Sequence, residues 1–463
     1  MANSPVLIVA AEARLVGGSP LLLQSLKQEL TIPNPQYQDA KKYGRWIGKR
    51  LKPFLYYYEE DRDGLVFPRG FAAQVVRLCR RLMPDVGLEI DDRRLLLPEV
   101  ELAFGGELRP YQAVALRAIL DRDFGVLESG TGSGKTVIAL AVFAARKQPV
   151  LVVVHNKELL YQWAERIETF LGIKAGLVGD GHFDLRPVTV AIVNSARKRL
   201  ADLTAEFGLL CVDECHRVPA TLFTEVARAF PAKYMLGLSA TAFRRDGLTK
   251  LIYFHLGDRV HQVDPEELRE SGAVLRAELI QRATGFTFYY RDNYPQLLSR
   301  LTQDEGRNQQ IADDVAGEIS RQPGTILVVS DRVAHCEKLA ELLIDRGVGV
   351  AVLTGKLGTE ERTTIVEKVR RGECQVLVST VQLIGEGFDC PDLATLFLTT
   401  PIKFTGRLLQ VVGRILRPAA GKQPRVFDYI DPVGVLKASA RAREQIFLQQ
   451  QQGSLPGLGA STG

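Results

Sequence analysis

The sequence predicts an α/β protein with two successive lobes, each built on a parallel sheet, behind a small N-terminal α+β region. Apolar runs of strand length alternate with helical stretches over residues 104–275, and the alternation resumes at residue 312. A chain of 463 residues is also too long for a single core. We expect an N-terminal accessory domain, a first lobe, an irregular connector, a second lobe and a disordered tail over residues 1–103, 104–275, 276–311, 312–446 and 447–463.

The composition indicates a globular protein with a mildly basic charge. Hydrophobic residues make up 46% and charged residues 24%, and the net charge is +5, which is compatible with a polyanionic partner. The 6 cysteines include no C-x-x-C pair, so we expect reduced core cysteines and neither a zinc site nor a disulfide framework. No apolar run reaches the length of a membrane span, and the first residues do not look like a signal peptide. We expect a cytoplasmic protein.

The N-terminal region carries a basic and aromatic run. It follows a strand at Val6–Ala10 and a helix at Leu21–Leu30, and it precedes a second helix at Ala72–Met83. Six cations and no acidic residue lie between Lys41 and Lys52, beside Trp46 and several tyrosines. Cations that meet phosphates and rings that stack on bases would suit a nucleic acid, with Lys49 and Arg50 as contacts. A solvated basic face over a small aromatic core is an equal alternative.

The stretch from Glu128 to Thr136 is a glycine-rich loop between an apolar run and a helix-forming run. This layout is typical of a cradle for nucleotide phosphates, because backbone N–H groups can crowd around an anion at a helix N-terminus. The strict pattern has Gly where this chain has Ser129. We expect Lys135 to reach the β- and γ-phosphates and Thr136 to bind Mg²⁺. The predicted ATP-binding loop comprises Ser129, Gly130, Thr131, Gly132, Ser133, Gly134, Lys135 and Thr136.

Other polar residues of the first lobe follow predicted strands or precede the loop. Arg109 and Gln112 lie about twenty residues before it, and a glutamine amide can read an adenine edge. Asn156 and Ser195 follow predicted strands at Val150–Val154 and Val188–Val193.

Two acids end a further buried run, Phe207–Val212. Ligands bind at the carboxyl ends of parallel strands, so Asp213 is expected to hold Mg²⁺ through water and Glu214 to orient or deprotonate the attacking water. His216 is either a coupling residue or a capping or core histidine. Hydroxyls of Ser239 and Thr241, which follow the strand Tyr234–Leu238, could link the ATP site to a second ligand or simply cap a helix.

The second half repeats the strand and helix rhythm without a phosphate loop. Thr354 and Gly355 follow a strand at Val348–Leu353, and Thr380 follows one at Val376–Val378. The remaining candidates are Gly387 and Asp389 in a glycine-containing loop, and Arg414 and Arg417 in QVVGRILR. Two arginines are suited to the charge that develops on a transferred phosphoryl group.

The ordered set LRPYQ, SGTGSGKT, DECH, SAT and QVVGRILR resembles the superfamily 2 helicases and translocases. HNKELLYQW and SATAFRRDG are most similar to the XPB, UvsW and restriction-subunit branch, and the segment from Pro33 to Gly70 resembles N-terminal pieces of such proteins more loosely. The resemblance implies two RecA-like lobes that close on one ATP, with Arg414 and Arg417 supplied by the second lobe. It also implies duplex or branched DNA as the partner and translocation from 3′ to 5′.

Under the same resemblance, Asn156, Ser195, Thr354, Gly355 and Thr380 are expected to grip DNA phosphates. The alternatives are an RNA helicase, a nucleic-acid-binding subunit without turnover, and the motor of a restriction or defence complex that needs a separate nuclease. The intact Lys135, Glu214 and Arg414 argue against loss of turnover. No nuclease motif is evident in the sequence.

Overall fold

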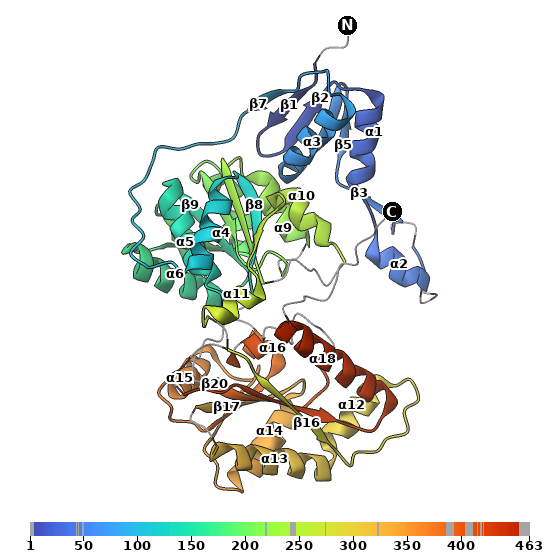
Figure 1. The fold of residues 1–463 in the computed structure, drawn as a ribbon, viewed down its shortest axis with the longest axis vertical. Coiled ribbons are helices and arrows are strands. Elements are labelled where there is room, and N and C mark those ends of the chain that lie inside the picture. Colours follow the sequence, from blue (N-terminus) through green and yellow to red (C-terminus); the bar gives the residue numbers. More distant parts are fainter. Residues whose placement is uncertain are drawn as a thin grey trace. The chain divides into compact units, whose positions relative to one another are not determined.

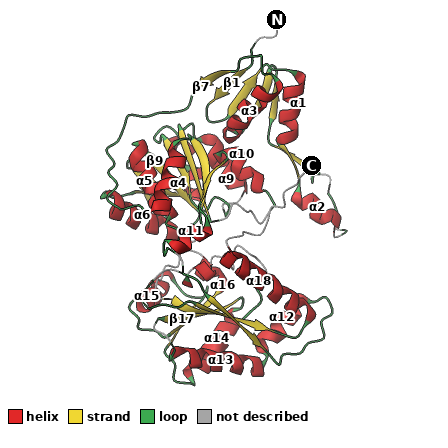
Figure 2. Cartoon of the chain, in the orientation of Figure 1, coloured by secondary structure: helices red, strands yellow, loops and turns green. Residues whose placement is uncertain are grey.

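The computed structural model describes residues 4–42, 44, 46–48, 51–130, 132–217, 220–240, 247–273, 275–321, 324–385, 393–402, 411–413, 415–416, 419 and 421–452. The chain divides into an N-terminal unit of residues 1–129 and 134–263 and a C-terminal unit of residues 130–133 and 264–463. In both units helices pack against sheets (Figures 1 and 2). No helix in these ranges is long and apolar enough to cross a membrane.

The N-terminal unit begins with a small five-stranded sheet of order β5-β6-β2-β1-β7, in which only β1 and β7 run parallel. Both predicted helices and the predicted first strand are confirmed to within one residue. Strands β3 and β4, which lie between β2 and β5 in the sequence, pair with each other as a separate antiparallel ribbon. The elements are Val6–Val9 (β1), Ala13–Val16 (β2), Pro20–Glu29 (α1), Thr31–Pro33 (β3), Pro35–Lys42 (α2), Phe54–Tyr56 (β4), Glu59–Asp61 (β5), Gly64–Phe67 (β6), Arg69–Phe71 (η1), Ala72–Leu82 (α3) and Glu89–Asp92 (β7).

The large sheet of the N-terminal unit has the order β11-β10-β12-β9-β13-β14-β8-β15, and only β11 runs antiparallel to its neighbour. This order brings the carboxyl ends of β8, β13 and β14 to one edge. The elements are Pro110–Leu120 (α4), Phe124–Glu128 (β8), Lys135–Arg146 (α5), Val150–Val154 (β9), Lys157–Leu171 (α6), Gly176–Gly179 (β10), His182–Asp184 (β11), Val188–Ile192 (β12), Val193–Lys198 (α7), Leu200–Leu203 (α8), Leu209–Val212 (β13), Ala220–Ala229 (α9), Tyr234–Ser239 (β14), Thr249–Leu256 (α10) and Arg259–Gln262 (β15).

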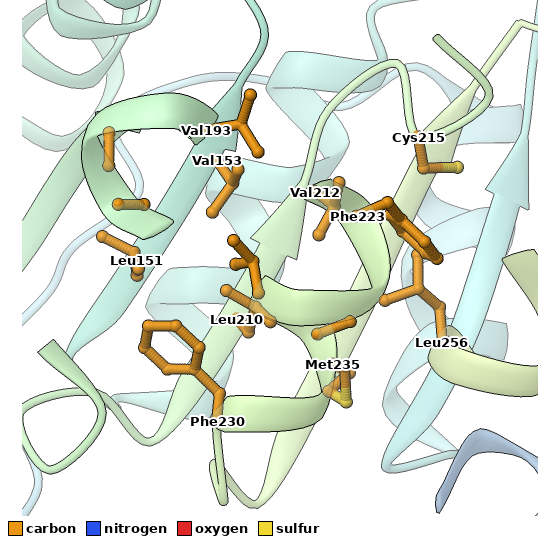
Figure 3. Close-up of a cluster of buried hydrophobic side chains, with 14 of the residues drawn as sticks. Leu151, Val153, Val193, Leu210, Val212, Cys215, Phe223, Phe230, Met235 and Leu256 are labelled. Atoms are coloured by element: carbon orange, nitrogen blue, oxygen red, sulfur yellow. The ribbon is translucent and has the colours of Figure 1, made fainter. Parts of the chain in front are cut away.

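Fully buried strands hold this large sheet together. All residues of β9 and β13 are buried, as expected for central parallel strands covered on both faces. One core cluster joins these strands to α9 and α10, and Figure 3 shows Leu210 and Val212 of β13 near Phe223, Phe230 and Leu256. This buried sheet positions the strand ends that the predicted site residues follow.

The small sheet packs against elements of the lobe that holds the large sheet. Phe254 of α10 belongs to the same buried cluster as the small-sheet core, where it makes edge contact with Phe71 at 5.5 Å between ring centroids. The buried guanidinium of Arg69 donates to the carbonyl oxygens of Ala232 at 2.8 Å and Ala10 at 3.2 Å. The segment between β7 and α4 also contacts the large-sheet lobe, because Leu95 forms an isolated β-bridge with Ala232. The small sheet and the large-sheet lobe are therefore in direct contact through Phe254, Arg69 and Leu95.

The C-terminal unit has a six-stranded, wholly parallel sheet of order β16-β21-β20-β17-β19-β18. Two buried ion pairs, Arg307 with Asp431 and Arg443 with Asp428, tie its helices to strand β21 and the residue after it. The elements are Pro265–Glu270 (α11), Glu278–Ala283 (β16), Tyr294–Gln303 (α12), Glu305–Ile319 (α13), Thr325–Ser330 (β17), Val333–Ile344 (α14), Val350–Leu353 (β18), Thr359–Arg370 (α15), Val376–Thr380 (β19), Val381–Gly385 (α16), Leu393–Leu398 (β20), Arg425–Ile430 (β21) and Gly434–Gln452 (α18).

Two sequence-based expectations are wrong in this unit. Residues 276–311 are not irregular, because they contain β16, α12 and the start of α13, and β16 is the edge strand of the sheet. Residues 447–452, expected to be disordered, continue helix α18. Glutamine is a good helix former, so its repetition there does not interrupt the helix. The expected tail from residue 453 onward lies outside the described residues.

Candidate functional site

The glycine-rich loop joins β8 to α5 at the edge of the large sheet, as the sequence predicts. Gly134 precedes the helix in a left-handed conformation with φ of 78°, and a Cβ there would lie 2.5 Å from Nε2 of Gln112. Lys135 begins the helix and its Nζ donates to the Ser129 carbonyl oxygen at 2.9 Å. Oγ of Ser129 is buried and has no hydrogen-bond partner among the described residues. The loop therefore offers free polar capacity beside a helix N-terminus, which fits a phosphate group. Thr131 lies outside the described residues.

Arg109 and Gln112 lie at the start of α4. The side chain of Gln112 is 5% exposed, and its amide oxygen accepts from the Arg109 backbone N–H at 2.9 Å. Its Nε2 lies close to Gly134. Residues more than twenty positions before Gly134 are thus brought to the phosphate loop. A buried amide held in this way cannot rotate freely, so its remaining polar atoms are presented in one direction.

Asp213 follows β13 and is held by a tryptophan. Nε1 of Trp163 donates to Oδ2 of Asp213 at 2.8 Å, and the Glu214 backbone N–H donates to Oδ1 at 2.9 Å. Trp163 is itself buried on α6. Sequence reasoning gave Trp163 no role at the site. The available signal was that a buried indole N–H requires an acceptor, and Asp213 supplies it.

Glu214 has an unusual backbone and an unsatisfied carboxylate. Its φ of 45° is rarely adopted by a residue with a side chain. Oε2 is buried and makes no hydrogen bond within the described part of the chain, and the nearest ion-pair atom is Nδ1 of His216 at 3.4 Å. That Nδ1 is already hydrogen-bonded to Oγ of Ser239 at 2.8 Å. Strain and an orphaned polar atom at one residue are features that active sites retain.

The two neighbouring carboxyl groups have opposite pKa shifts. Burial, together with the charge of Glu214, raises the pKa of Asp213 to about 6 against the opposing effects of Trp163 and Lys135. Burial also acts to raise the pKa of Glu214, but the positive charges of Lys135 and His216 outweigh it and the pKa is lowered. Glu214 is therefore ionised at neutral pH. Asp213 is a buried acid that a nearby divalent cation would keep ionised.

Ser239 connects the loop to the segment after β13. Its carbonyl oxygen accepts from the Ser129 N–H at 3.0 Å, and its hydroxyl bonds His216. Both side chains are largely buried. The arrangement brings the predicted coupling residues His216 and Ser239 into contact with each other. Thr241 lies outside the described residues.

The predicted DNA contacts occupy both units. Asn156 caps α6, where Oδ1 accepts from the Leu159 N–H at 2.9 Å, and Ser195 is half-buried in α7. Thr354 is buried after β18, Gly355 is exposed beside it, and Thr380 ends β19. The remaining candidates, Lys49, Arg50, Gly387, Asp389, Arg414 and Arg417, lie outside the described residues.

Comparisons with known proteins agree with this arrangement. Residues 105–244 match the family model described as Type III restriction enzyme, res subunit, and residues 310–419 match the Helicase conserved C-terminal domain. A fragment of a putative HsdR subunit of a type I restriction enzyme from Vibrio vulnificus has a TM-score of 0.58 at 18% identity, covering 73% of this chain and 66% of the fragment. The shared fold is that of tandem RecA-like lobes.

Proteins with similar sequences indicate which class of helicase this chain resembles. The DNA 3'-5' translocase XPB2 of Sulfurisphaera tokodaii is 30% identical over 348 residues, which cover 67% of this chain and 79% of the relative. The probable helicase D10 of Escherichia phage T5 is 26% identical, with coverage of 68% and 70%. The chain belongs to the superfamily 2 helicases of the XPB and restriction-subunit type, which are ATP-dependent DNA helicases.

Proposed function

We propose that this protein is an ATP-driven motor that moves on duplex or branched DNA from 3′ to 5′. The direction and the DNA substrate are taken from its relatives, one of which is named a DNA 3'-5' translocase. The observation that carries the proposal is the environment of the Glu214 carboxylate. A buried, ionised carboxylate, one oxygen of which makes no hydrogen bond to any described residue, next to a lysine-bearing phosphate loop, is the group that a water molecule attacking a phosphate would need.

Each site residue has a separate role in this proposal. Lys135 binds the β- and γ-phosphates and releases its present contact with the Ser129 carbonyl when ATP arrives. Thr136 and Asp213 hold Mg²⁺, which when bound neutralises phosphate charge. Trp163 keeps the Asp213 carboxylate in one orientation. Glu214 accepts a proton from the attacking water.

Four further roles, three in ATP binding and one in coupling, are part of the same proposal. Gln112 and Arg109 contact the adenine side of the nucleotide. The position of Gln112 near Gly134 and of Arg109 at the start of α4 supports this role. Arg414 and Arg417 stabilise transition-state charge, and Gly387 and Asp389 complete the site. His216 and Ser239, with Thr241, pass the state of the phosphate loop to the DNA-binding residues.

The DNA contacts proposed in the lobes are mainly to phosphates. Asn156 and Ser195 in the first lobe and Thr354, Gly355 and Thr380 in the second are small polar residues after strands. Such contacts carry little base information, so we expect weak sequence preference.

The segment after α2 is a second proposed DNA contact. Trp46 is 89% exposed, and Lys41 and Lys52 are exposed near it in sequence. Nδ2 of the Asn34 side chain donates to the Lys52 carbonyl oxygen at 2.8 Å, so the residue before α2 is bonded to the last cation of the run. Replacing Lys49, Arg50 and Lys52 with alanine should flatten the salt dependence of DNA affinity by up to about 2.7 units of slope, at about 0.9 per phosphate contact. Equal slopes for the wild type and the triple variant would leave only a solvated basic face.

The proposed function is tested by ATP hydrolysis with single-stranded, duplex, forked and RNA effectors, together with strand displacement. We expect DNA to stimulate turnover more than RNA. Stimulation by RNA alone would overturn the assignment to DNA. A second candidate, the motor subunit of a restriction complex, is favoured by the match of residues 105–244 to a restriction-enzyme subunit. That candidate predicts that a nuclease co-purifies with the chain.

A further inference from the structure

Helix α10 lies between the small sheet and the phosphate loop. Its residue Tyr253 donates from the phenol to Oε1 of Glu128 at 2.7 Å. Its next residue, Phe254, is buried in the small-sheet core against Phe71. Glu128 is the last residue of β8 and directly precedes the loop. Successive residues of one short helix therefore contact the residue that precedes the phosphate loop and the buried core of the N-terminal sheet.

Helix α10 packs closely against η1, the short helix that directly follows strand β6 of the small sheet. A Cβ added to Gly70 would lie 2.5 Å from the Gly257 nitrogen and 2.6 Å from the His255 carbonyl carbon, so the two backbones touch. Tyr57 adds a second ring against Phe254 at 5.5 Å between centroids. Because packed interiors transmit displacement instead of absorbing it, a shift of the small sheet must move α10.

The contact between α10 and Glu128 is equally specific. Glu128 is 7% exposed, and its second oxygen lies 3.4 Å from Nη1 of Arg259. Burial and the bond to Glu128 raise the pKa of Tyr253, so the phenol stays protonated and remains a donor. The backbone of Glu128 is also fixed, since its carbonyl accepts from the Val263 N–H at 2.9 Å. Release of Tyr253 would leave a buried carboxylate one residue before Ser129.

We infer that Tyr253 and Glu128 are positioning residues through which the N-terminal sheet sets the affinity of the phosphate loop for ATP. The inference rests on the proposed ATP site. The loop binds phosphate in both ground and transition states, so a shift of the loop changes both alike. The expected signature is a change in KM for ATP with little change in kcat.

A double-mutant cycle in the full-length chain tests this inference. Tyr253→Phe removes only the hydroxyl, and Phe71→Leu loosens the packing on Phe254 while leaving an apolar side chain. Each is expected to raise KM for ATP between about 2-fold and 30-fold, the range found for residues along a coupling network. The double variant should match Tyr253→Phe alone, because the connection is already broken.

Controls separate this coupling from a loss of stability. Leu339→Ala perturbs a separate buried core in the C-terminal unit and should lower the melting temperature while leaving KM unchanged. Effects of Tyr253→Phe and Phe71→Leu that multiply, or a Tyr253→Phe variant with normal KM whatever its melting temperature, would overturn the inference. A wild-type protein that hydrolyses no ATP under any condition would instead refute the proposed function.

Discussion

Replacement of Arg69 by methionine tests whether the small sheet and the large sheet unfold together. The guanidinium is 1% exposed and donates to two carbonyl oxygens, of Ala232 and Ala10. Each hydrogen bond from a charged donor contributes about 1.5–3 kcal/mol. Methionine fills the space but leaves both oxygens unpaired, so we expect a loss of about 3–6 kcal/mol. Burial lowers the pKa of Arg69 to about 9, so the side chain is still charged at neutral pH.

The chain contains a suitable probe for this experiment. Of the 2 tryptophans, Trp163 is 1% exposed in the large-sheet lobe and Trp46 is 89% exposed, so the change in fluorescence on unfolding reports mainly Trp163. In urea, with slopes of about 1–3 kcal/mol per molar, Arg69→Met should lower the Trp163 midpoint by at least about 1 M. Arg80→Met, at an exposed position on α3, is the matched control. An unchanged Trp163 midpoint would refute the expectation that the two sheets unfold together.

Three other outcomes are expected. Lys135→Ala should lower ATP turnover by at least about 10²-fold without moving the melting temperature of the nucleotide-free protein, and near-normal turnover would contradict the site. Burial lowers the pKa of His335 to about 3, so its stabilisation is complete above pH 6.5 and is lost as the pH falls. Between pH 7.5 and 5 the wild type should lose about 2 kcal/mol more than His335→Gln in urea titrations, and equal losses would refute this. Asp431→Asn strands Arg307 and should cost about 3–5 kcal/mol of unfolding free energy, whereas a cost below about 1 would mean the pair is not buried in solution.

The parts of the fold predicted from the sequence share one physical cause. Central parallel strands such as β9 and β13 are buried on both faces and therefore appear as continuous apolar runs. Edge strand β16 has the sequence ELIQRA, most of which is exposed, so it gives no such run and the segment was predicted to be irregular. The helices after it were missed as well, although Asn293 and Asp304 cap them through side-chain bonds.

The same limit applies to the site. The phosphate loop and the acids after β13 are local patterns, which a sequence displays directly. The bond from Trp163 to Asp213 joins residues 50 positions apart, and the bond from Tyr253 to Glu128 joins residues 125 apart. Neither pair has a local pattern that indicates its partner. Only the strand order, which places β13 and β8 on either side of β14, brings these elements together.

The central claim is that Glu214 activates water at an ATP site, and Glu214→Gln tests it most directly. The amide keeps the shape of the side chain but cannot act as a base. ATP binding, measured by titration with a fluorescent ATP analogue, should stay close to that of the wild type, while DNA-stimulated turnover should fall by at least about 10²-fold. Normal turnover in Glu214→Gln, or loss of nucleotide binding with turnover, would contradict the claim.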